Sequence, residues 1–390
     1  MTIASIIFFV SLLGLIWIYV GYMSFLLIAT IIKKKRSKTD QSIRPTVSIM
    51  IMTFNEEDVI RKKIENTLAL DYPRENIEII VVDSNSSDKT QGIVREFESK
   101  GVKLIVQEKR EGKASAIHYG MKQATGEIAI STDANAYYAS DVIKKIVPHF
   151  ADEKVGGVTG AMMQVDKSKT NISKGGDMYW KMEKLMRTNE SKLHSVIGMS
   201  GEICCFRRNL FEDTQLKDWY NKGENDDFSL SYYIIKKGYK VAYAPDAYVW
   251  EAAPDNIGDL FKQKVRIITM TIKTMIMRPS MIGFKHGIYS AVILPSRKIL
   301  PLYSPVFLVA LIITNFILIE QGQIYYYIFI AQVLMYVLAV LGFVSILKKI
   351  LPINIANYFV LLNLTIIFGW ISFLIGKDFT IWEKVSSTRN

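Results

Sequence analysis

Long apolar runs lie towards both ends of the chain, and short apolar runs alternate with helix-like polar stretches between them. The first long run, residues 3–32, contains no charged residue, and its length of about 30 exceeds the roughly 20 residues that span a bilayer core. Three later runs are also long enough to cross, at residues 302–319, 324–347 and 353–375. The pattern predicts four transmembrane helices around one large domain.

Positive charge beside the first apolar run predicts the orientation of the chain. Lys33, Lys34, Lys35 and Arg36 follow it directly, and such clusters mark the cytoplasmic side. Four spans from an outward amino terminus would put the basic tail outside, so the C-terminal topology stays open. The expected division is a transmembrane helix at 1–32, a basic cytoplasmic linker at 33–44, a cytoplasmic domain at 45–278, an interfacial segment at 279–300, about three transmembrane helices at 301–376 and a tail at 377–390.

The first half of the domain alternates between strand and helix patterns. Continuous apolar runs of strand length indicate strands buried on both faces, as in a parallel sheet between helices. The alternation therefore predicts an α/β fold with a doubly wound, mostly parallel sheet. Strands are expected at 47–53, 77–83, 102–107 and 128–133, and helices at 57–70, 88–100 and 113–124.

The second half of the domain is less regular. It is expected to recognise the molecule that accepts a transferred group. It shows a helix at 141–150, an extended segment at 155–165 and a polar helix at 173–191. Apolar residues then recur at helical spacing over 257–275, with basic residues on the other faces. This pattern predicts an interfacial helix that leads into the membrane.

Composition narrows the functional classes. About half of the residues are apolar, and the formal net charge is +11. Much of the positive charge lies next to the predicted spans, where anionic membrane lipid is the nearest partner. No basic recognition helix or RNA-binding signature is present, so nucleic acid is not expected as a partner. Cys204 and Cys205 are the only cysteines, and we interpret them as reduced structural thiols.

Carboxylates follow two of the predicted strands, and a lysine begins a predicted helix. Asp83 is positioned to accept hydrogen bonds from a base or ribose, although an ordinary strand-to-helix turn explains it equally well. Lys113 follows a glycine at a helix start, where a bound diphosphate would suit it; a solvated surface cation is the alternative. Asp133 and Asn135 share one side of an extended chain and offer oxygen ligands to Mg²⁺ or Mn²⁺.

A further pair of carboxylates begins a later helix. Asp226 and Asp227 suit the first turn for electrostatic reasons alone. The functional alternative makes Asp227 a general base that deprotonates an acceptor hydroxyl as it attacks a sugar.

Taken in order, these elements resemble the family 2 glycosyltransferases, in particular the membrane-integrated branch that includes synthases of hyaluronan, chitin, cellulose and poly-N-acetylglucosamine. The resemblance runs from about Pro45 to Met277. It implies nucleotide binding by Asn55, Glu56, Asp83, Lys113 and Asp133, a metal at Asp133 and Asn135, catalysis by Asp227 with Asp226, and acceptor contacts by Gly201, Gln263 and Arg266.

Three positions depart from the family pattern. Asn135 stands where the metal motif has a second aspartate, Ile267 where a tryptophan lines the acceptor channel of processive synthases, and Asn225 where a threonine is common. These departures weaken the assignment to a long-chain synthase more than the assignment to sugar transfer.

The resemblance implies an A-type glycosyltransferase fold and inverting transfer from a nucleotide-activated sugar, expected to be UDP-linked, at the cytoplasmic face of the plasma membrane. A growing polysaccharide and a lipid or lipid-linked sugar are the two candidate acceptors. From another class, a transporter or scaffold with a non-catalytic nucleotide-binding domain remains an alternative.

Overall fold

The computed structural model describes residues 2–33, 38–165, 172–211, 224–253, 256–344, 346–347 and 350–379, without the side chains of 164–165 and 172–179. Lys34, Lys35 and Arg36 of the predicted basic linker therefore lie outside the described residues. So do residues 380–390 of the predicted tail.

One sheet of eight strands organises the domain, in the order β3-β2-β1-β4-β7-β6-β8-β5. The four strands at the β3 end are parallel to one another, whereas β7 is antiparallel to both β4 and β6, and β5 is antiparallel to β8. This confirms the mostly parallel first half and the mixed second half. The strands are β1 Val47–Thr53, β2 Ile77–Asp83, β3 Val102–Val106, β4 Ile128–Asp133, β5 Tyr137–Tyr138, β6 Val155–Val165, β7 Cys204–Arg207 and β8 Lys240–Ala252.

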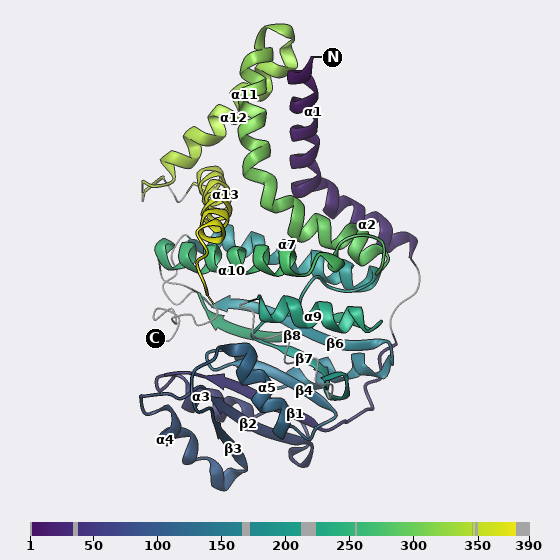
Figure 1. Cartoon of the computed structure of the whole chain (residues 1–390), viewed down its shortest axis with the longest axis vertical. Coiled ribbons are helices and arrows are strands. Elements are labelled where there is room, and N and C mark those ends of the chain that lie inside the picture. Colours follow the sequence, from purple (N-terminus) through teal and green to yellow (C-terminus); the bar gives the residue numbers. More distant parts are fainter. Residues whose placement is uncertain are drawn as a thin grey trace.

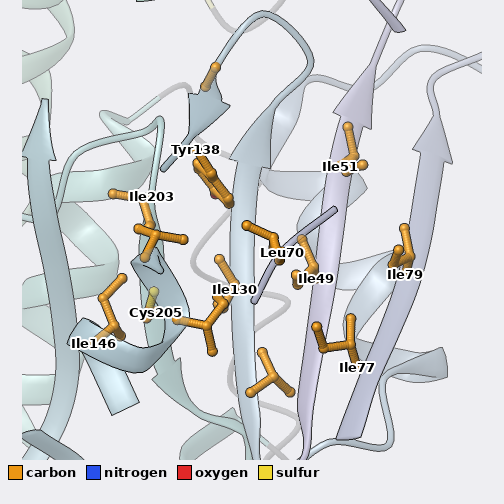
Figure 2. Packing of buried hydrophobic residues seen from close by; sticks show 14 of the residues in the cluster. Ile49, Ile51, Leu70, Ile77, Ile79, Ile130, Tyr138, Ile146, Ile203 and Cys205 are labelled. Atoms are coloured by element: carbon orange, nitrogen blue, oxygen red, sulfur yellow. The ribbon is translucent and has the colours of Figure 1, made fainter. Parts of the chain in front are cut away.

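The strand register aligns the polar residues that end the parallel strands. Thr53 at the end of β1 lies opposite Asp83 of β2, and Met52 lies opposite Asp133 of β4. Alternate residues of these strands, including Ile49, fill a fully buried core (Figure 2). The other face is buried as well, which explains the continuous apolar runs.

The helices of the first half are shorter than the sequence predicts. Predicted helix 88–100 begins only at Thr90, because the Asp88 carboxylate accepts the Thr90 backbone N–H at 2.9 Å. Predicted helix 57–70 likewise begins at Ile60, after the loop that follows β1. These helices are α3 Ile60–Leu68, α4 Thr90–Arg95, α5 Lys113–Gln123 and α6 Val142–Ile146.

Two helices lie between the sheet and the apolar spans (Figure 1). They are α7 Ile172–Leu193 and α10 Ile257–Met277. α10 lies across the ends of the spans, and its position in the membrane interface stays a prediction. A third helix, α9 Asp226–Lys236, lies nearer the sheet, and β8 was not expected from the sequence.

Four helices are long and apolar enough to cross a membrane, as predicted, among the described residues. They are Ile3–Ile32 (α1 Ile3–Ile16 and α2 Tyr22–Ile32 around a π-turn), Tyr289–Gln321 (ending in α11 Ser304–Leu318 and a short 3₁₀ turn), α12 Gln323–Leu341 and α13 Leu351–Leu374.

The second of these helices starts earlier than predicted. Residues 289–300, assigned from sequence to an interfacial segment, continue without a break into the span. The helix accommodates Pro295 in the π-turn Pro295–Ile299, and a 3₁₀ turn follows.

Candidate active site

Two loops at the carboxyl ends of β1 and β2 are bound to each other by side chain to backbone hydrogen bonds. Asn55, at a left-handed φ of 53°, accepts the Ser87 N–H and donates its own N–H to the Ser86 hydroxyl. Asp83 is fully buried and accepts from the Ser86 backbone N–H and from Gln91. Asp83 therefore orders this loop, and its contact with a base stays a prediction.

Lys113 joins three parts of the domain at one point. Its ammonium lies 2.6 Å from the Asp133 carboxylate, 4.0 Å from Asp227 and 3.2 Å from the Gly201 carbonyl oxygen. Burial alone would lower the pKa of Lys113, but the charges of Asp133 and Asp227 hold it well above its usual range. The lysine is thus a fixed cation rather than a solvated surface group.

The first turn of α9 presents its two carboxylates to the same cavity. Asn225 caps the helix by accepting the Phe228 N–H at 3.1 Å, and the Cys204 thiol lies 3.5 Å from Asp227. Burial raises the pKa of Asp226 to about 7, with a contribution from the charge of Asp227. Burial also raises the pKa of Asp227, against the attraction of Lys113.

Gly201 is glycine for a steric reason. A Cβ atom at this position would lie 2.7 Å from Oδ2 of Asp227 and 2.9 Å from Nζ of Lys113. Such contacts are closer than van der Waals packing permits, so any side chain here would separate the loop from both groups. Gly201, which was predicted to belong to an acceptor loop, therefore sets how closely this loop approaches Asp227 and Lys113.

A cavity of about 380 Å³ lies between the sheet, α9 and the membrane-side helices α7 and α10. It collects most of the residues predicted from the sequence, whereas Asn55, Glu56 and Asp83 do not line it. The predicted residues that do are Lys113, Asp133, Asn135, Gly201, Asp226, Asp227, Gln263 and Arg266.

Three carboxylates of this cavity were not predicted, Glu183, Glu202 and Glu251, and the last two lie on its sheet side. Glu202 follows the tight glycine, and its pKa is raised to about 8 by burial and then by the charges of Glu251 and Asp133. Glu251 lies near the end of β8, so it could be placed only once that strand was known. An acidic residue near the end of a strand would have indicated Glu251, but this strand was not predicted.

The acidic side of the cavity suits a divalent cation. Asn135 donates its amide to Glu251 at 2.8 Å, which places an acid beside the expected metal pair of Asp133 and Asn135. Burial is the main cause of the raised pKa of Glu202, and the charges of Glu251 and Asp133 add to it; an oxygen-liganded cation would offset that part of the shift. Among the described residues, however, no three acids, histidines or cysteines already form a metal-binding group.

The membrane side of the cavity is built from ion pairs that the sequence did not reveal. Glu183 accepts from Arg187 at 2.9 Å and from Arg297 at 2.7 Å. Arg187 also donates to the Ser200 hydroxyl at 3.0 Å, next to the tight glycine. Glu183 and Arg297 are 114 residues apart in the chain, so no local sequence pattern indicates that they pair.

Comparison with known proteins shows what the domain that carries this site is similar to. Residues 48–214 match the model described as glycosyl transferase family 2. A probable glycosyltransferase of Bacillus subtilis, YdaM, is 28% identical over 277 residues, which is 66% of this chain and 64% of that protein. Poly-β-1,6-N-acetyl-D-glucosamine synthase of Staphylococcus epidermidis is 28% identical over 222 residues, 56% of this chain and 53% of the synthase.

The chain thus spans between about half and two thirds of the length of these curated relatives. Among solved structures, a mannosyltransferase from Pyrobaculum calidifontis, in complex with GDP-Man and Mn²⁺, superposes with a TM-score of 0.72 at 24% identity. The match covers 95% of this chain and 100% of that one. At this identity the likeness establishes the A-type glycosyltransferase fold with its membrane-side helices.

Proposed function

Since this chain is a membrane-integrated glycosyltransferase of family 2, we propose that it moves a sugar from a nucleotide-diphosphate donor to an acceptor hydroxyl with inversion. The observation that carries the proposal is that the Lys113 ammonium lies within 4.0 Å of both the Asp133 and the Asp227 carboxylates, in one cavity. A non-catalytic scaffold has no need for a buried base beside a buried cation, so we set that alternative aside.

Asp227 is the proposed general base. It is held by the first turn of α9 and faces the cavity, where it would take the proton of the acceptor hydroxyl as that oxygen attacks the anomeric carbon. The bond from that carbon to the diphosphate breaks on the opposite face, so configuration inverts. No protonating acid is required, because the leaving diphosphate departs as a stabilised anion.

Lys113 and Arg266 are the cations proposed to stabilise that leaving group. Burial lowers the pKa of Arg266, although nearby carboxylates, first Asp133, oppose the shift. Asp133 and Asn135 would hold Mg²⁺ or Mn²⁺, with Glu251 adjacent. A bound divalent ion supplies further neutralisation of diphosphate charge.

The donor and orientation follow the resemblance rather than a contact in the structure. We propose a UDP-linked sugar, bound at the loops after β1 and β2 by Asn55, Glu56 and Asp83. The basic residues after the first span support a cytoplasmic position for the domain at the cell membrane.

A growing polysaccharide is the first candidate acceptor, because a curated relative is named as a polysaccharide synthase. A membrane lipid or lipid-linked sugar is the second. It is favoured by Ile267, which lines the cavity without the aromatic surface that stacks on a sugar chain, and by the cavity's contact with a spanning helix at Lys298.

A donor panel tests the proposal. Purified protein in lipid nanodiscs is incubated with UDP- and GDP-linked sugars, Mg²⁺ or Mn²⁺, and membrane lipid extract, and nucleoside diphosphate release is measured with product mass. One active donor with a polymer supports the first acceptor, and a single added sugar supports the second. The same release from Asp227→Asn would contradict the assignment of the base.

A further inference from the structure

The membrane side of the cavity carries more positive than negative charge. Arg187, Arg297 and Lys298 come from α7 and the spanning helix Tyr289–Gln321, and all three line the cavity. Glu183 is shared by the two arginines, and Glu190 pairs with Arg297 at 2.8 Å. Both acids of this cluster are therefore committed to arginine.

Lys298 is the cation left over. Its ammonium lies 5.4 Å from the centre of the Phe228 ring, next to Asp227 in sequence. Among the described residues, no carboxylate oxygen lies within 4.0 Å of the Lys298 ammonium, the distance that an ion pair requires. A cation that faces a cavity without its own acid gains most from an anion on the ligand.

The position of Lys298 is fixed by its neighbours. Ser296, two residues before it, accepts a hydrogen bond at 3.0 Å from the indole of Trp17 in the first span. Arg297, the residue directly before it, is bound to Glu183 and Glu190, and Glu190 also accepts a hydrogen bond from the Tyr22 hydroxyl at 2.9 Å. The first span and α7 thus hold the turn that carries Lys298, so the ammonium is presented to the cavity from a fixed backbone.

The same helix leads from this cation to surface that lipid would cover. Val306 and Val309 are 61% and 54% exposed on its apolar part. The eight residues from 298 to 306 pass through a π-turn and a 3₁₀ turn into α11, so they span roughly 12–16 Å at about 1.5–2.0 Å per residue. An amphiphile with its apolar tail along this helix would therefore place its polar head in the cavity.

We infer that the acceptor is a membrane-anchored amphiphile with a phosphate-type anion between its apolar tail and the hydroxyl that is glycosylated, and that Lys298 with Arg187 binds this anion. The inference rests on the proposed function and names the acceptor class of the same site. A neutral polysaccharide would leave the charge of Lys298 unmatched in the cavity.

Binding of a matched pair of probes tests the anion site without requiring turnover. The full chain in phosphatidylcholine nanodiscs is titrated with dodecyl phosphate and with dodecanol. Lys298→Gln should weaken dodecyl phosphate binding about tenfold or more, the usual effect of one lost charge-assisted hydrogen bond. Dodecanol binding should not change.

Two variants serve as controls. Lys285→Gln removes an exposed lysine of the preceding segment and should change neither titration. Lys298→Arg keeps the charge and should restore binding, which separates charge recognition from a folding defect. Equal dodecyl phosphate affinity in Lys298→Gln and the parent protein would overturn the inference.

Transfer and competition identify the source of the anion. With the active donor, a glycosyl dodecyl phosphate should have a KM about tenfold below that of a neutral dodecyl glycoside, and Lys298→Gln should remove this difference while the donor KM stays constant. Competition by equimolar phosphatidylglycerol would assign the site to bulk lipid, and a raised donor KM would assign it to the donor; either overturns the inference. No transfer by the parent protein to any acceptor would instead contradict the proposed function.

Discussion

The two halves of the sheet hold their parts of the site in different ways. In the parallel half, backbone register places Asp83 and Asp133 at the ends of the two strands that flank β1. In the mixed half, the side chains are placed by long-range contacts that reach into the spans, such as the pairs of Arg297 with Glu183 and Glu190. In the proposed function, the donor side thus depends on local folding, and the acceptor side depends on contacts with the membrane helices.

Lys113, Asp227 and Gly201 meet where the two halves join, and we call this cluster the junction. Among its residues, Asp227 should have the largest effect on activity when it is substituted. Asp227→Asn keeps the size of the side chain but removes the base, and general-base catalysis is worth about 10²–10⁴-fold. We expect kcat to fall by that range with donor affinity unchanged, as measured by single-turnover kinetics and titration calorimetry. Asp246→Asn, on an exposed residue, is the matched control and should not affect kcat.

Removing the cation of the junction should cost activity on the donor side. Lys113→Met leaves Asp133 and Asp227 without their shared cation, and we expect about a hundredfold loss in kcat/KM, since charge-assisted contacts contribute about 1.5–3 kcal/mol each. Lys103→Met, on an exposed strand lysine, provides the comparison. Unchanged kcat/KM in Lys113→Met would contradict the role of this lysine in binding the leaving group.

The spacing of the junction can be changed without changing its charge. Gly201→Ala places a methyl group 2.7 Å from Asp227 and 2.9 Å from Lys113, and we expect roughly a tenfold loss of kcat. Gly198→Ala is the control from the same loop, because a Cβ there would lie 3.6 Å from its nearest neighbour. Equal kinetics for the two variants would refute the steric role of Gly201.

The pH profile should carry the signature of the buried acids. A base must be deprotonated, and burial raises the pKa of Asp227 and that of Asp226, the latter to about 7. We therefore expect the acidic limb of kcat/KM to lie at a higher pH than the ordinary aspartate pKa of about 4 would give, because the base must lose its proton to act. Asp226→Asn removes a neighbouring negative charge and should move this limb to lower pH; an unshifted limb would show that Asp226 does not influence the base.

The acid cluster near Asn135 predicts a smaller, metal-linked effect. Asn135→Asp replaces the donor to Glu251 with a like charge, so the variant should unfold at lower temperature without metal. Mn²⁺ should then raise its Tm by more than it raises that of the parent protein, as measured by differential scanning fluorimetry. An equal or smaller Mn²⁺ shift in the variant would argue against a cation at this cluster.

The sequence predicted the parallel half well because its signals are local. Buried strands such as Val47–Thr53 read as continuous apolar runs, and the polar residues follow where the strands end. Lys113 and Asp133 could therefore be grouped before their 2.6 Å contact was known. Helix starts were less accurate, since side chains such as Asp88 decide where a helix begins.

The membrane side could not be predicted in the same way. Arg187 and Glu183 lie in a helix whose partner, Arg297, follows more than a hundred residues later, and β8 with Glu251 lacks the continuous apolar pattern of the parallel strands. The spanning helix that begins at Tyr289 was expected only from residue 302, since the charges of Arg297 and Lys298 precede the long apolar run. Only the three-dimensional arrangement brings these groups to one cavity.

The central claim is that Asp227 acts as the base at the junction between a donor half and a membrane-linked acceptor half. The most direct test measures donor binding and product formation in parallel for the parent protein and Asp227→Asn in nanodiscs. We predict donor affinity within about threefold and product formation reduced at least about a hundredfold. Product formation by Asp227→Asn at the parent rate would contradict the account.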